Sequence, residues 1–65
     1  HELWLEWQAC TGLPDEARLS RLAAWVLAAD RAGADYGLRL AGVEIEPGQG
    51  DAHRARCLEA LALWR

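Results

Sequence analysis

Tyr36–Pro47, YGLRLAGVEIEP, has the pattern of a β-hairpin and decides the fold of this 65-residue chain. A two-residue loop at positions 41–42 would place Arg39 opposite Glu44 on one face of the sheet and apolar residues opposite one another on the other face. A shift by one residue would place Arg39 among leucines, so the pattern predicts a single register. The apolar residues alternate as in a half-buried strand: Tyr36, Leu38, Leu40, Val43 and Ile45.

A strand and a long helix are predicted before the hairpin. Apolar and polar residues alternate over Glu2–Trp7, which indicates a first strand. Trp4 interrupts its polar face, so we expect both faces to be partly covered, as in a central strand. The helix is predicted from Pro14, at the first helical position, to Arg31, with Gly33 as its stop signal. Its apolar stripe recurs every three or four residues: Leu19, Leu22, Ala23, Val26 and Ala29, with Trp25 at the edge.

A second helix is predicted after the hairpin, from Asp51 as N-cap to about Trp64. Its apolar stripe comprises Cys57, Leu58, Leu61 and Trp64. The order of elements is therefore β-α-β-β-α. A helical connection suits a parallel first pair of strands, whereas the short loop makes the second pair antiparallel. We predict an α/β fold with a small mixed three-stranded sheet and two helices, in one domain spanning residues 1–65.

Composition restricts the classes of function. The net charge of −3 argues against nucleic acid as a partner, and two cysteines are too few for a disulfide framework. The sequence shows no signal peptide and no membrane-spanning run, which predicts a cytoplasmic segment without direct membrane contact. Because the chain has no methionine and begins with His1, we interpret it as a piece of a longer protein.

Four tryptophans are many for so short a chain, and such large side chains need a surface to pack on. Most of them are expected in the core. Trp4 and Trp64 are the exceptions, and we predict that they contribute to an interaction surface. That surface would contact another polypeptide or a second copy of the chain.

Gly48–Arg54 is the stretch that most resembles a ligand-binding loop. Gly48 and Gly50 would let the backbone approach a ligand, and the free N–H groups at the helix start would favour an anion. His53 and Arg54 would add donors in the first turn. However, Asp51 as N-cap would occupy those N–H groups and repel an anion, so a glycine turn followed by a cap is the alternative interpretation.

Metal and nucleophile chemistry have weaker support. Zinc ligands could be imagined among Cys10, His53, Cys57 and His1, but structural zinc sites usually show CxxC or HxxxH spacing, which this chain lacks. Cys57 and His53 are four residues apart and could form a nucleophile pair, yet Cys57 lies on the apolar stripe. Glu44 and Glu46 share a strand face, which solvation explains. We predict no catalytic residue, no metal site and no cofactor.

The stretch Arg18–Leu63 resembles the C-terminal part of bacterial DUF58 proteins, which are similar to von Willebrand factor A-type domains. The preceding LWLEW strand is also similar. One departure is Ala41, where the family would have proline. The matching features are LSRL at 19–22, WVL at 25–27, YGLRL at 36–40, Ile45, Pro47, Gly50 and the H-R-x-x-C-L-x-A-L run at 53–61.

The resemblance implies a part in assembling or remodelling other proteins, since family members are often membrane-anchored and encoded near MoxR-type AAA ATPases. A-type domains often bind a metal through Asp-x-Ser-x-Ser, but Glu6–Cys10 lacks both serines, so no metal site is carried over. We therefore expect a non-catalytic interaction segment. Its partners would be the remainder of its parent chain and a MoxR-type ATPase. The alternative is a ligand-binding or enzymatic domain that uses the loop at 48–54.

Overall fold

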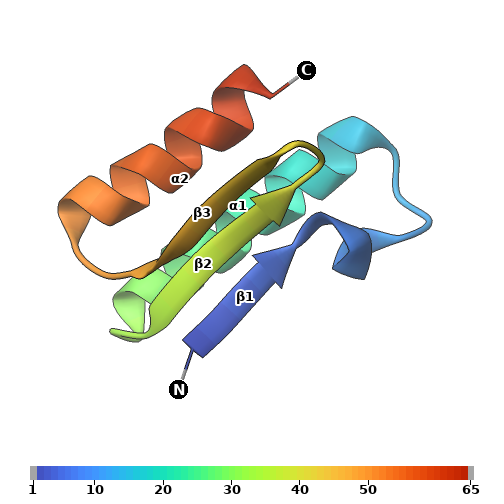
Figure 1. Cartoon of the computed structure of the whole chain (residues 1–65). Helices are drawn as coiled ribbons and strands as arrows, with labels where there is room; N and C mark the ends of the chain where they lie inside the picture. Colours follow the sequence, from blue (N-terminus) through green and yellow to red (C-terminus); the bar gives the residue numbers. More distant parts are fainter. Residues whose placement is uncertain (1, 65) are drawn as a thin grey trace.

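The computed structural model describes residues 2–64 and confirms the predicted α/β fold in the order β-α-β-β-α. A mixed three-stranded sheet packs against two helices (Figure 1). A short 3-10 helix interrupts the chain between the first strand and the first helix. The elements are β1 (Glu2–Glu6), η1 (Trp7–Cys10), α1 (Asp15–Arg31), β2 (Asp35–Leu40), β3 (Val43–Gly48) and α2 (Asp51–Leu63).

The sheet has the order β1-β2-β3, with β1 parallel to β2 and β2 antiparallel to β3. Both pairings are as predicted. The expectation that the first strand resembles a central strand is wrong, because β1 lies at an edge and β2 is central. Trp4 is nevertheless half-buried, since its ring covers Gly37 of β2. The first strand also ends one residue earlier than predicted, and Trp7 begins η1.

The hairpin register is the predicted one, with Arg39 opposite Glu44 and Leu40 opposite Val43. The loop at 41–42 has a positive φ of 82° at Gly42 and none at Ala41, which is the combination of a type II turn. Farther from the loop, Tyr36 lies opposite Gly48, so β3 contains one residue more than β2 over this stretch. This irregularity includes Pro47, which has no N–H to donate to the ladder.

Helix α1 begins at Asp15, and Pro14 is its N-cap, one residue outside the predicted position. Asp15 and Glu16 occupy the first turn, where the helix dipole favours acidic groups. Gly33 ends the helix as predicted. With a φ of 71°, it allows its own N–H and that of the following residue to reach back to carbonyls of the last turn. These two hydrogen bonds form a Schellman motif.

Helix α2 begins at Asp51, so the prediction of Asp51 as N-cap is wrong by one position. The N-cap is Gly50, whose φ of 95° is accessible to glycine, and no side chain of residues 2–64 caps the helix. The Asp51 carboxylate lies instead 3.5 Å from Arg54, one turn along the helix. The helix ends at Leu63, and Trp64 lies just beyond it.

One hydrophobic core joins the buried side chains of both helices to one face of the sheet. Tyr36, Leu22 and Leu38 are the largest fully buried side chains, and burial of each leucine stabilises the fold by about 1.5–3 kcal/mol. The other face of the sheet carries Trp4, Arg39 and both glutamates of β3. Within residues 2–64, no helix combines the length and apolar character needed to cross a membrane.

Candidate functional site

The Gly48–Arg54 stretch is occupied by contacts within the chain. Gly48 ends β3, and the His53 ring packs directly against it: a Cβ on Gly48 would lie 3.0 Å from His53 Nδ1. The side-chain amide of Gln49 donates a hydrogen bond to the Asp35 carboxylate. The structure thus brings the predicted ligand-loop residues together, but it fills the space beside Gly48 with the imidazole of His53.

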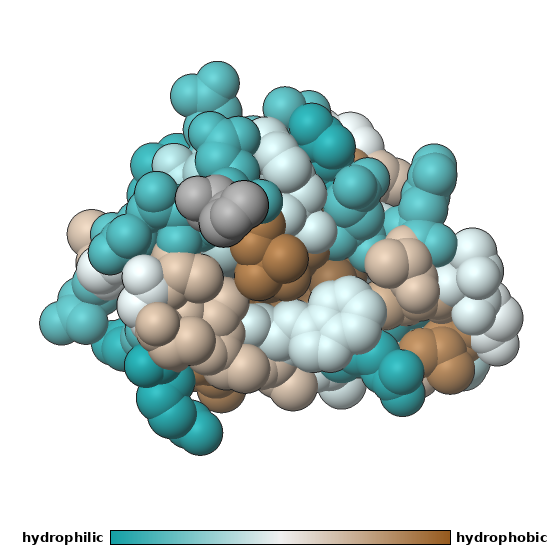
Figure 2. Space-filling model, turned by 90° about the horizontal axis from the view of Figure 1, so that it is seen from below, coloured by the Kyte–Doolittle hydropathy of each residue, from teal (hydrophilic) through white to brown (hydrophobic). Residues whose placement is uncertain are grey.

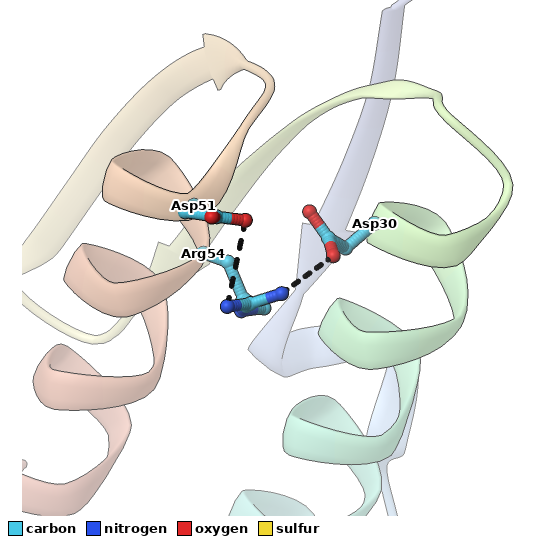
Figure 3. Close-up of polar contacts among 3 residues, drawn as sticks. All are labelled: Asp30, Asp51 and Arg54. Atoms are coloured by element: carbon cyan, nitrogen blue, oxygen red, sulfur yellow. Dashed lines mark hydrogen bonds and ion pairs between the residues drawn. The ribbon is translucent and has the colours of Figure 1, made fainter.

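Arg54 connects the two helices. Its Nη1 lies 3.1 Å from Asp30 Oδ2 on α1, and its Nη2 lies 3.5 Å from Asp51 Oδ1 on its own helix. Figure 3 shows the guanidinium between the two carboxylates, below the first turn of α2. Because two carboxylates already face this guanidinium, an incoming anion would meet negative charge on both sides. The geometry therefore disfavours an anion site here.

His53 belongs to a buried polar cluster. Its Nε2 lies within hydrogen-bonding distance of the Tyr36 carbonyl, which can only accept, so the hydrogen bond assigns the proton to Nε2. Cys57 Sγ is 3.7 Å from the same nitrogen, and the Tyr36 ring meets the imidazole edge-on at 4.6 Å. The Tyr36 hydroxyl is buried without a hydrogen-bond partner among the described residues.

The Cys57–His53 pair forms as its helical spacing predicts, but its environment does not activate a nucleophile. Burial raises the pKa of the Cys57 thiol, which keeps it protonated at neutral pH. The imidazole nitrogen nearest the sulfur donates to a backbone carbonyl, so it has no free lone pair with which to accept the thiol proton. The pair lies in the core and contributes to packing.

Metal ligands do not gather in the described part of the chain, where no group of three or more His, Cys, Asp or Glu side chains is placed to hold an ion. Cys10 and Cys57 are both buried and free. His1, a candidate zinc ligand in the sequence, lies outside the described residues.

Arg39 organises the open face of the sheet. Its guanidinium carbon lies 3.8 Å from the centroid of the Trp4 ring, and its nitrogens lie 3.6 Å from Glu6 and 3.7 Å from Glu44. The predicted Arg39–Glu44 pairing is therefore present, together with a second carboxylate from β1. A shallow groove of about 380 Å³ adjoins this cluster at the hairpin tip. The single positive charge of Arg39 offsets one of the two carboxylate charges, so this cluster keeps a net charge of −1.

The Trp64 side chain already makes contacts within the chain. Its ring lies 4.4 Å from that of Trp7, and its indole N–H donates a 3.2 Å hydrogen bond to the Ala41 carbonyl. Arg18 covers Trp7, with its guanidinium carbon 5.0 Å from the ring centroid. These contacts attach the end of α2 to the hairpin loop and η1. The contribution of Trp64 to an interaction surface stays a prediction.

An apolar groove runs along the outer edge of β1, with a volume of about 430 Å³. One wall is β1, where Leu3 is 45% exposed and Trp4 is half-buried. The other wall is the C-terminal half of α1, where small side chains leave space beside Trp25. The residues that line this β1–α1 groove are Leu3, Trp4, Leu5, Trp25, Ala28, Ala29, Ala32 and Ala34.

The view in Figure 2 looks onto this side of the molecule from below Figure 1, and a band of tan, brown and pale atoms crosses it between hydrophilic margins. Of the groove residues, only Trp4 was predicted from the sequence to be a site residue. Two exposed alanines, Ala28 and Ala32, were not predicted as site residues because they lie off the apolar stripe of α1. Their spacing of four residues, about one helical turn, places them on the same side of the helix and is the sequence signal that could have identified them.

In comparisons with known proteins, no protein-family model, curated protein or solved structure matches this chain. The resemblance to DUF58 proteins stays a prediction from the sequence motifs.

Proposed function

We propose that this chain is a non-catalytic interaction segment of a DUF58-type protein and that it binds another polypeptide through the β1–α1 groove. The observation that carries the proposal is the groove itself, which presents apolar side chains from two elements beside a strand edge that no described element pairs with. Apolar surface gathered in one place is typical of protein contacts, whereas single exposed apolar residues are ordinary.

The energetics favour a protein partner. Covering Leu3, now 45% exposed, together with the alanines of α1 would remove apolar area from water at about 25 cal/mol per Å². Trp25 offers large, rigid contact area beside the groove, and tryptophan is enriched among the residues that dominate binding energy. Among residues 2–64, no ionisable side chain lines this groove, which disfavours acid–base chemistry in it.

The partners proposed follow from the resemblance. The remainder of the parent chain is the first, because it would be held beside the groove at high effective concentration. A MoxR-type AAA ATPase is the second, and with it the segment would act in protein assembly. The ligand-binding alternative at Gly48–Arg54 is weaker, because its His53 and Arg54 side chains already have partners inside the chain.

A matched pair of variants tests the groove. Ala28→Arg places a long charged side chain in it, whereas Ala55→Arg makes the same change at an exposed position of α2. An apolar fluorescent dye should bind the wild type and Ala55→Arg alike and bind Ala28→Arg several-fold less. Equal dye binding by all three proteins would contradict the groove as the accessible apolar surface.

An amide correlation spectrum titrated with phosphate, a nucleotide, Mg²⁺ and Zn²⁺ tests the alternative. We expect no saturating shifts at Gly48–Arg54. Shifts that saturate and cluster there would refute the purely structural interpretation and make the loop a binding site.

A further inference from the structure

We infer that the β1–α1 groove binds an extended peptide segment that adds to the sheet as a fourth strand beside β1, with apolar side chains toward α1 and a basic side chain against Glu2 and Asp35. This inference rests on the proposed function and specifies the chemistry of the partner. It combines three independent features: a free strand edge, a strip of small side chains and an unbalanced acidic pair.

The strand edge supplies the backbone contacts. β1 pairs with β2 on one side only, and no described element pairs with its other side. Half of the N–H and C=O groups of an edge strand point away from the sheet, and an added strand can pair with them. Peptides that bind in this way gain affinity from main-chain hydrogen bonds and specificity from alternate side chains.

The floor of the groove selects apolar side chains on one face of the added strand. Leu5 belongs to the core on the helix-covered side of β1, and Ala28 of α1 and Ala32, the C-cap of that helix, lie alongside. Alanines at these positions leave room for branched side chains from a neighbouring strand. Charged side chains would be desolvated there without a partner, which is costly.

The opposite face selects positive charge. Glu2 lies directly opposite Asp35 in the register of β1 with β2, so two exposed carboxylates are neighbours on the open face. Like charges in this arrangement repel each other. Neither carboxylate has an ion pair within residues 2–64, whereas Glu6 at the other end of β1 already pairs with Arg39. A lysine or arginine on the next strand would relieve the repulsion.

The same charges disfavour a second copy of this chain as the occupant. Antiparallel pairing of two β1 strands about Trp4 would bring Glu2 of each copy opposite Glu6 of the other. Parallel pairing in register would bring each glutamate opposite itself. Both arrangements place carboxylates against carboxylates, so the complementary partner is a different, basic and apolar strand.

The test uses a short capped peptide in which lysine and valine alternate, added to the 65-residue chain and followed by amide NMR. We expect saturating shifts at Leu3–Leu5 and at Ala28 and Ala32. A control peptide with glutamate in place of lysine should bind at least about tenfold more weakly. Glu2→Lys should reduce the preference for the lysine peptide, whereas Glu59→Lys, the same change at an exposed position of α2, should leave it unchanged.

N-methylated peptides test strand addition itself. In an extended peptide, the valine N–H groups point to one edge and the lysine N–H groups to the other. If the peptide pairs with β1, methylation of one set should reduce affinity by about tenfold or more, and methylation of the other set should be tolerated. The sensitive set also reveals whether the added strand is parallel or antiparallel to β1, because the groove fixes the side that the valines face.

Failure of this inference can be distinguished from failure of the proposed function. If both methylated peptides bind as well as the parent peptide and Ala28→Arg still weakens binding, the groove accepts apolar peptides without strand pairing. That result would overturn the strand inference and leave the proposed function intact. If the lysine peptide causes no shifts at the groove and Ala28→Arg has no effect on dye binding, both are refuted.

Discussion

The Tyr36 hydroxyl offers the sharpest test of the structure, because removing it should stabilise the protein. Tyr36 is fully buried, and its hydroxyl oxygen has no hydrogen-bond partner among the described residues. In the unfolded chain, water satisfies this hydroxyl. Folding therefore desolvates a polar group without compensation, at a cost of about 1–3 kcal/mol.

Tyr36→Phe keeps the ring, its edge-on contact with His53 and the backbone hydrogen bond to the His53 imidazole. The variant loses only the dispersion contacts of one oxygen atom, which are worth about 1 kcal/mol at most. The net expectation is a gain of about 1 kcal/mol in the free energy of unfolding. For a domain of this size, that gain corresponds to a rise in Tm of roughly 4–8 °C.

Urea unfolding followed by tryptophan fluorescence measures the change. We expect a higher midpoint with an unchanged slope, since the surface exposed on unfolding is nearly the same. Tyr36→Leu is the control: it removes the hydroxyl and also most of the ring, so the cavity term should destabilise it by about 2 kcal/mol or more. A loss of about 1 kcal/mol in Tyr36→Phe would refute the reasoning, because it would mean that the hydroxyl is hydrogen-bonded, for example to a buried water.

Three further predictions concern other contacts. Gly37→Ala should destabilise the fold by about 1–3 kcal/mol in urea unfolding, because the added Cβ would lie 2.7 Å from the Trp4 ring; an unchanged midpoint would contradict this close approach. Stability should be level to about pH 8 and fall above about pH 9: burial raises the pKa of Cys57 and Tyr36 from ordinary values of 9.0 and 10.0, so the folded state holds protons that the unfolded state releases. Because the chain contains no lysine, no lysine titration overlaps this loss of stability, and Cys57→Ala should make the loss smaller. A free energy of unfolding that rises with pH over this range would contradict the prediction. Arg54→Gln should lower the free energy of unfolding by about 0.5–1 kcal/mol, less at high salt, because the Arg54 side chain remains 37% exposed; a loss of several kcal/mol would contradict an ion pair that solvent screens.

The sequence alone determined the order of the strands and α-helices and the hairpin register, but not the 3-10 helix η1. Alternation in β2 and β3 has a period of two, so the pairing of Arg39 with Glu44 could be predicted from order along the chain. The stop at Gly33 and the burial of Cys57 on its apolar stripe were equally local signals. The N-cap of α2 was predicted one residue too late, because Gly50 takes that position and Asp51 is the first helical residue.

Only the tertiary structure decided which surfaces are occupied and which are free. Arg54 pairs with Asp30, 24 positions away in sequence, and His53 hydrogen-bonds the Tyr36 carbonyl, 17 positions away. The loop has the composition of a ligand site, but its polar side chains already have partners within the chain. The apolar groove arises in the same way, because packing of α1 on the sheet brings Ala28 and Ala32 beside β1. Periodicity reports which face of one element is apolar. Whether that face is covered depends on elements distant in sequence, and therefore on how the chain packs.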